Sequence, residues 1–150
     1  MSTDGFYRIV VPTDFSSCAE EAWTKAQQLA HAFESELVLV HVLDEPTFYA
    51  AAPFARRVGQ EVYATGRRRA EEQLEHWVEK ARASGLEARA QLRVGVPHRE
   101  IVEVAADERA DLVVIGTHGR GGLSRAVLGS VADRVIRLAP CPVLSVREPS

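Results

Sequence analysis

Cysteine, long apolar runs and strong net charge are all scarce in this sequence of 150 residues. The two cysteines, Cys18 and Cys141, lie far apart, so we expect reduced thiols and neither a disulfide framework nor a structural zinc cluster. The longest apolar run, residues 37–43, is too short to span a bilayer, and residues 1–7 lack the basic and apolar segments of a signal peptide. We therefore expect a cytoplasmic protein with no membrane partner.

The net charge is only −3, and the basic residues form no long run. The densest basic patch, residues 67–69, is followed at once by Glu71 and Glu72, which is typical of a solvated helix face where opposite charges pair. We therefore expect no nucleic-acid partner. Apolar residues make up 46% and charged residues 26% of the chain, as in an ordinary globular protein, and residues 1–150 are expected to form a single domain.

The common phosphate-binding fingerprints are missing as well, although glycines cluster between residues 116 and 130. A P-loop ends in Gly-Lys followed by Ser or Thr, and the sequence contains no Gly-Lys pair. The dinucleotide fingerprint follows the first strand of its domain, whereas this glycine cluster follows the fourth expected strand. The cluster therefore has to be interpreted from its own spacing.

Apolar runs do alternate with segments of helical periodicity along the chain. Strands are expected at residues 8–13, 37–43, 88–94, 112–117 and 143–146. Helices are expected over roughly 15 residues from Ser17, at 60–84, from Pro97 to about 110, and at 130–139. This alternation predicts an α/β fold, an open five-stranded parallel sheet with helices on both faces.

Two segments of this pattern have distinctive local features. Ser17, with Glu20 three residues later, fits a capping box and is expected to cap the first helix. Residues 47–66 are apolar without a clear period and contain Pro53 and Gly59, so we expect an irregular or partly helical excursion there.

The segment from Gly116 to Ser130 connects an expected strand to an expected helix, where backbone N–H groups can converge on an anion. Gly116 and Gly119 would let the backbone approach a ligand with no Cβ atom in the way. Gly129 and Ser130 begin a helix whose free N–H groups and dipole favour negative charge. The structural alternative is that Ser130 only forms a capping box with Asp133; we favour a phosphate site.

Polar residues follow other strands at the carboxyl edge of the predicted sheet, where such sheets bind ligands. Asp14 follows the first strand and can accept hydrogen bonds from ribose hydroxyls or help to hold a cation, or it can instead cap the next helix. Residues 42–44 follow the second strand, and His41 within it is interpreted as a packed histidine. No nucleophile is spaced to work with His118, so we name no catalytic residue.

These motifs together resemble the universal stress protein family. The resemblance covers the whole chain and rests on segments in this order: Pro12-Thr13-Asp14-Phe15-Ser16, His41-Val42, Gly95-Val96-Pro97, Gly116-x2-Gly119-x9-Gly129-Ser130 and Ala139-Pro140-Cys141-Pro142-Val143. It implies a Rossmann-like sheet with strand order 3-2-1-4-5. The complete glycine motif resembles the branch of the family that binds ATP.

The resemblance also implies a nucleotide site and an assembly. Pro12 and Asp14, with Thr13 between them, would contact adenine and ribose, and Val42 would meet the base through its backbone. The phosphates would lie against Gly116, Thr117, His118, Gly119, Arg120, Gly121, Gly122, Gly129, Ser130, Val131 and Ala132. Magnesium or manganese often accompanies these phosphates. Members usually form homodimers through the last strand, here residues 143–146, which would also cover an apolar sheet edge.

The expected function is that of an ATP-binding stress-response sensor or regulator with at most weak ATP hydrolysis. One alternative is a dedicated ATPase or nucleotidyl-transferring enzyme at the same sheet edge. Another is an interaction module that works without nucleotide. Residues 46–66 vary within the family, and their role is not predicted.

Overall fold

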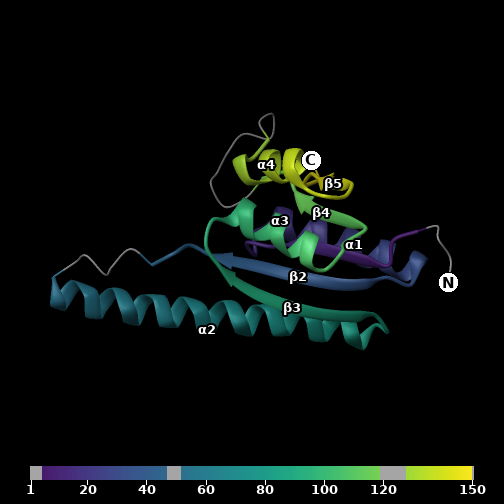
Figure 1. Ribbon diagram of the computed structural model, residues 1–150. Helices are drawn as coiled ribbons and strands as arrows, with labels where there is room; N and C mark the ends of the chain where they lie inside the picture. The colour runs from purple at the N-terminus through teal and green to yellow at the C-terminus, as the bar shows by residue number, and fades with distance from the viewer. Residues whose placement is uncertain (1–4, 47–51, 119–127, 150) are drawn as a thin grey trace.

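The structure of the chain is a computed structural model that describes residues 5–46, 52–118 and 128–149. Figure 1 shows the elements, which alternate along the chain as β1 (Arg8–Pro12), α1 (Ser17–Phe33), β2 (Glu36–Leu43), α2 (Pro53–Ala83), β3 (Glu87–Val94), α3 (Pro97–Asp107), β4 (Leu112–Gly116), α4 (Ser130–Leu138) and β5 (Val143–Val146). The expected α/β class is confirmed. Within the described ranges, no helix is both long and apolar enough to cross a membrane.

The strands form one parallel sheet in the order β3-β2-β1-β4-β5, which confirms the order implied by the family resemblance. The chain runs from β1 outward to β3, returns to place β4 on the other side of β1, and then continues to β5. The order therefore reverses between β1 and β4. Connections on the two sides of this point diverge at the carboxyl edge and leave room there for a ligand.

Helices cover both faces of the sheet. Ile9 and Val11 pack on one face with Trp23 of α1 and Leu74 of α2. The alternate residue Val10 packs on the other face, together with side chains of α3 and α4, namely Ile101, Val104, Ala105, Ala132 and Val135. Because side chains of a strand alternate between the two covered faces, the strands have to be apolar at nearly every position.

Helix α2 is longer than the sequence predicts. It begins at Pro53 and not near residue 60, so the expected start of this helix is wrong. Of the two alternatives for residues 47–66, irregular or partly helical, the helical one holds from Pro53 onward, while residues 47–51 lie outside the described ranges. Pro53 occupies the first helical turn, where its missing N–H has no partner to lose, and Gly59 is tolerated within the helix. Neither residue therefore interrupts the helix, although the sequence alone suggests that both would.

A cluster of four charged side chains ties the amino ends of the strands together. Arg8 Nη2 lies 3.2 Å from Glu36 Oε2, and Arg89 Nε lies 2.6 Å from Glu36 Oε1. Arg89 also pairs with Glu108, which follows α3. The hydrogen bond from Arg89 lowers the pKa of the Glu108 carboxyl. Burial by itself would raise the pKa of the Glu36 carboxyl, but the hydrogen bonds from Arg89 and Arg8 outweigh this effect, so the pKa of Glu36 is also lowered. These pairs lie at the amino edge of the sheet, opposite its carboxyl edge.

Candidate functional site

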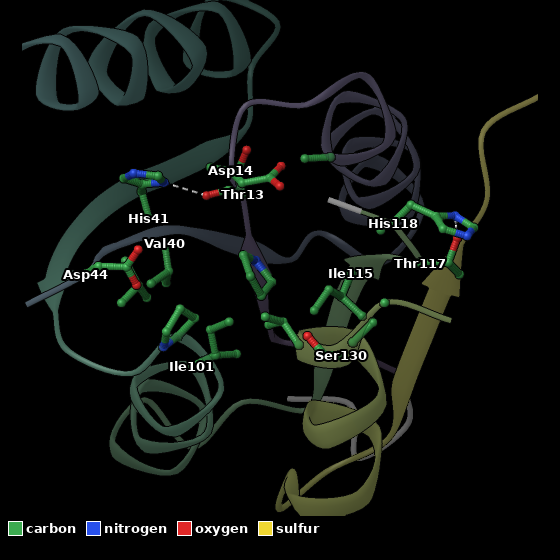
Figure 2. Close-up of a pocket in the computed structure, with 18 of the residues that line it drawn as sticks. Thr13, Asp14, Val40, His41, Asp44, Ile101, Ile115, Thr117, His118 and Ser130 are labelled. Atoms are coloured by element: carbon green, nitrogen blue, oxygen red, sulfur yellow. Dashed lines mark hydrogen bonds between the residues drawn. The ribbon is translucent and has the colours of Figure 1, made fainter. Parts of the chain in front are cut away.

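A pocket of about 450 Å³ opens at the carboxyl edge of the sheet (Figure 2). Every predicted site residue that the structure describes lines it: Pro12, Thr13, Asp14, Val42, Gly116, Thr117, His118, Gly129, Ser130, Val131 and Ala132. The other predicted residues, Gly119, Arg120, Gly121 and Gly122, lie outside the described ranges. The fold thus brings the ends of β1, β2 and β4 and the first turn of α4 to one place.

The turn after β1 forms one wall of the pocket. Thr13 is buried; its N–H donates to the Val40 carbonyl at 2.7 Å, and its hydroxyl accepts from the Phe15 N–H at 2.9 Å. Asp14 Oδ1 accepts from the Ser16 N–H at 3.0 Å, so Asp14 both shapes the turn and lines the pocket. The residue that caps α1 is Ser16, whose hydroxyl accepts from the Ala19 N–H; the expected cap at Ser17 is wrong by one residue.

His41 has a role that the sequence did not indicate. Its Nδ1 lies 2.7 Å from the Thr13 carbonyl (Figure 2), which can only accept, so Nδ1 carries a hydrogen and donates it. Its ring packs on Phe15 with a centroid distance of 4.7 Å, and Phe15 contacts Trp77 edge-on at 5.5 Å. Phe15 has a φ of 63°, a strained conformation for a bulky residue. The aromatic stack holds this strained turn beside the pocket.

Gly116 is needed for packing between elements. A Cβ atom added to it would lie 3.0 Å from both the carbonyl oxygen and the Sγ of Cys18 in α1. The expectation that this glycine spares room for a ligand is therefore wrong in its reason, because the atom it lacks would point at a helix. Its backbone nevertheless lines the pocket. The Cys18 thiol in turn donates to the Val146 carbonyl at 3.3 Å, which joins α1 to the sheet edge.

The first turn of α4 faces the pocket without a side-chain cap. Gly129 is the N-cap residue, and its N–H donates to the Thr117 carbonyl at 2.7 Å. Ser130 is already the first helical residue, so the alternative capping box of Ser130 with Asp133 is wrong. Since no described side chain caps this helix, the N–H groups of its first turn remain available at the pocket, where the helix dipole favours negative charge.

The remaining lining separates the pocket into polar ends and an apolar floor. Val40, Ile101 and Ile115 provide apolar lining (Figure 2). Asp44 also lines the pocket, and its signal in the sequence was its place after β2, at the same edge as Asp14. Figure 2 places Thr117 and His118 apart from Asp14, with the Thr117 hydroxyl 3.0 Å from His118 Nδ1.

The described part of the chain gives little support for a metal site made by protein ligands alone. No three His, Cys, Asp or Glu side chains within it gather closely enough to hold a metal ion. The described lining offers hydrogen-bonding groups: the carboxylates of Asp14 and Asp44, and backbone donors at the first turn of α4.

Comparison with known proteins agrees with this geometry. The universal stress protein family model matches residues 5–147. Universal stress protein MJ0531 of Methanocaldococcus jannaschii is 37% identical over 153 residues, covering 96% of this chain and 84% of that protein. The solved structure of MJ0577, from the same organism, is 30% identical, with a TM-score of 0.84 over 98% of this chain and 99% of its own.

A third relative carries a ligand. The universal stress protein from Archaeoglobus fulgidus was solved in complex with dAMP; it is 28% identical and has a TM-score of 0.65, over 93% of this chain and 97% of its own. The family match spans nearly the whole described fold, and the sequence identities and structural similarity point the same way. The chain belongs to the universal stress protein family.

Proposed function

We propose that the chain binds ATP in the pocket at the carboxyl edge, as one nucleotide-binding domain. The observation that carries this proposal is that a single pocket joins the uncapped amino end of α4 to the Asp14 carboxylate across an apolar floor. The α4 N–H groups suit the phosphates, and Asp14 suits the ribose hydroxyls. The apolar residues between them suit a nucleobase, which would contact the backbone at Val42. The relative that binds dAMP supports an adenine nucleotide.

The proposal extends to the role of the protein. We take it to be a nucleotide-dependent sensor or regulator of the stress response, with at most weak ATP hydrolysis, because the lining of the pocket consists mainly of groups that suit holding a nucleotide. Magnesium or manganese would then be held mainly by the phosphates. Cys18 and Cys141 are free thiols, which fits the reducing cytoplasm.

We also propose a homodimer formed through β5. This strand lies at the edge of the sheet, where its outer backbone groups have no strand beside them within the described fold. Leu144 on β5 is 38% exposed, and Ile136 and Leu138 of the neighbouring helix α4 are 42% and 57% exposed. A second copy of β5 would pair the backbone and cover this apolar edge.

Two measurements test this proposal. In the first, freshly purified protein is denatured and the released material is chromatographed to detect any nucleotide already bound. In the second, folded protein is titrated calorimetrically with ATP and Mg²⁺. Asp14→Asn keeps an oxygen for the Ser16 N–H and removes only the charge, so we expect roughly tenfold weaker binding from loss of one charge-assisted hydrogen bond. Asp107→Asn, at the end of α3, is the matched control and should leave affinity unchanged.

Two results would count against the proposal. Absence of any adenine nucleotide in both measurements would favour an interaction module that works without nucleotide. Fast, saturable ATP turnover that His118→Ala abolishes while binding persists would favour a dedicated ATPase.

A further inference from the structure

The first half of α2, residues 53–69, stands outside the body of the protein. The buried residues of this helix are Ala70, Leu74, Val78 and Ala81, all in its second half. Among residues 53–69 only Gly59 and Tyr63 are even half-buried. Figure 1 shows this end of α2 extending past the sheet. The projecting half-helix therefore has little to pack against in the part of the chain that the structure describes.

The projecting half-helix carries an apolar stripe. Phe54, Val58 and Val62 are 77%, 44% and 68% exposed. Residues four apart lie on one face of a helix, so these three side chains form a continuous exposed row. Apolar side chains grouped in this way on a surface mark a place where another molecule binds.

The low intrinsic stability of the projecting half-helix also favours a binding partner. A helix of this length without tertiary contacts is only marginally stable in water. It contains Gly59 and Gly66, and glycine is among the weakest helix formers. Pairing with another surface would supply the packing that the sheet does not provide.

We propose that two copies of the chain pair these half-helices in antiparallel fashion around a two-fold axis at Val58. This arrangement places Val58 against its own copy and Phe54 of each chain against Val62 of the other. The apolar stripe is thus complementary to itself, as an interface between identical subunits has to be.

The charges beside the stripe fit the same axis. Arg57 and Glu61 are one turn apart and, at 100° per residue, flank the stripe on the same side. An antiparallel partner brings Arg57 of one copy near Glu61 of the other, and the two-fold axis makes this pair twice. The self-complementary charge favours a second copy of the chain as the occupant.

The interface is distinct from the proposed β5 pairing. α2 packs beside β3, at the edge of the sheet opposite β5. A contact of two or three helical turns is small against the roughly 800 Å² per partner of a stable complex, so we expect weak, concentration-dependent pairing. Together with β5 pairing, it would build assemblies larger than a dimer.

The test is oxidative crosslinking of full-length protein in a Cys141→Ser background, which removes the half-exposed native thiol and keeps the buried Cys18. Val58→Cys places a thiol on the proposed axis and should give a disulfide-linked dimer. Gln60→Cys places one on the far side of the same helix and should not. Equal crosslinking of the two variants, or none in either, would overturn the proposal.

A charge swap tests the register. When Arg57→Glu is added to Val58→Cys, the new carboxylate at position 57 of one copy lies near Glu61 of the other, and this repulsion should cause loss of the crosslink. The further change Glu61→Arg brings opposite charges together again and should restore the crosslink. Failure of this restoration overturns the register. Ser145→Pro, which blocks β5, should leave the crosslink in place. Sedimentation of the protein with phosphatidylglycerol vesicles, without any crosslink at position 58, would assign the stripe to a membrane instead.

Discussion

At the scale of single residues, the glycines of this chain have different structural roles. Gly116 gives room for Cys18 of α1, whereas Gly66 lies in the projecting part of α2 with nothing within 4 Å of the place where a Cβ would be. Gly129 lies against the Thr117 carbonyl, 2.9 Å from the position of an added Cβ. The same residue type thus permits close packing at two positions and only lowers helix stability at the third.

This contrast gives a prediction. Gly116→Ala should lower the free energy of unfolding by about 1–3 kcal/mol, because the new methyl group meets the backbone and thiol of Cys18, neither of which can move freely. Gly66→Ala, the matched control, should leave stability unchanged or raise it by up to about 1 kcal/mol. Urea denaturation of both variants checks this. Equal effects would show that the β4–α1 contact is looser than the distances indicate.

At the scale of elements, the amino ends of the strands and the end of α3 are joined by charge. Glu108 is reached by Arg89, and the backbone carbonyl of Glu108 accepts a hydrogen bond from Arg8 Nη1 at 2.7 Å. This charged cluster links β1, β2 and β3 to the residue after α3, far from the pocket. It fixes the strands at one end, while the turns at the other end line the pocket.

The Glu108 pairing predicts a pH dependence of stability. The folded-state pKa of Glu108 lies below its ordinary value of 4.5, so its carboxylate stabilises the fold above that pH, and the contribution is lost as pH falls through the lowered pKa. Glu108→Gln should therefore lower the free energy of unfolding by about 1 kcal/mol at pH 7. It should have no effect at a pH where the Glu108 carboxyl of the wild type is protonated in both the folded and the unfolded state.

The measurement is urea denaturation of the wild type and the variant across the acid range. Glu103→Gln, on the exposed side of α3, makes the same change in net charge and should have no comparable effect. If Glu108→Gln lowers the free energy of unfolding by the same amount from neutral to acid pH, the effect comes from packing and not from the charge of Glu108.

At the scale of the whole molecule, the sheet ends in the short strand β5. The Pro142 carbonyl accepts from the N–H of Val113 in β4, and the Val146 carbonyl accepts from the N–H of Thr117, which follows β4. Because alternate residues of a strand direct their backbone groups to opposite sides, the N–H and carbonyl of Ser145 point outward from the sheet. This outward side is where the proposed dimer would form.

Ser145→Pro should therefore convert the dimer to a monomer, since it removes an outward N–H and leaves the bonds to β4 in place. Ser145→Ala keeps that N–H and should remain dimeric. Sedimentation velocity at micromolar concentration distinguishes the two states. A dimer that survives the proline would have to use another surface.

The sequence by itself determined the class of this fold and the order of its strands and helices along the chain. Strands covered on both faces must be almost wholly apolar, so runs such as residues 37–43 are visible without any tertiary information. The rule that ligands bind at the carboxyl edge then brought Asp14 and the glycine segment into one region before any contact was known.

Only the tertiary structure decided which atoms those residues meet. Gly116 faces Cys18, and His41 holds the carbonyl of Thr13, across sequence separations that no local pattern encodes. The length of α2 was also not predictable, because Pro53 is compatible with the first turn of a helix and Gly59 weakens a helix without ending it. Local periodicity fixes which faces are apolar, whereas packing distances depend on residues brought together by the fold.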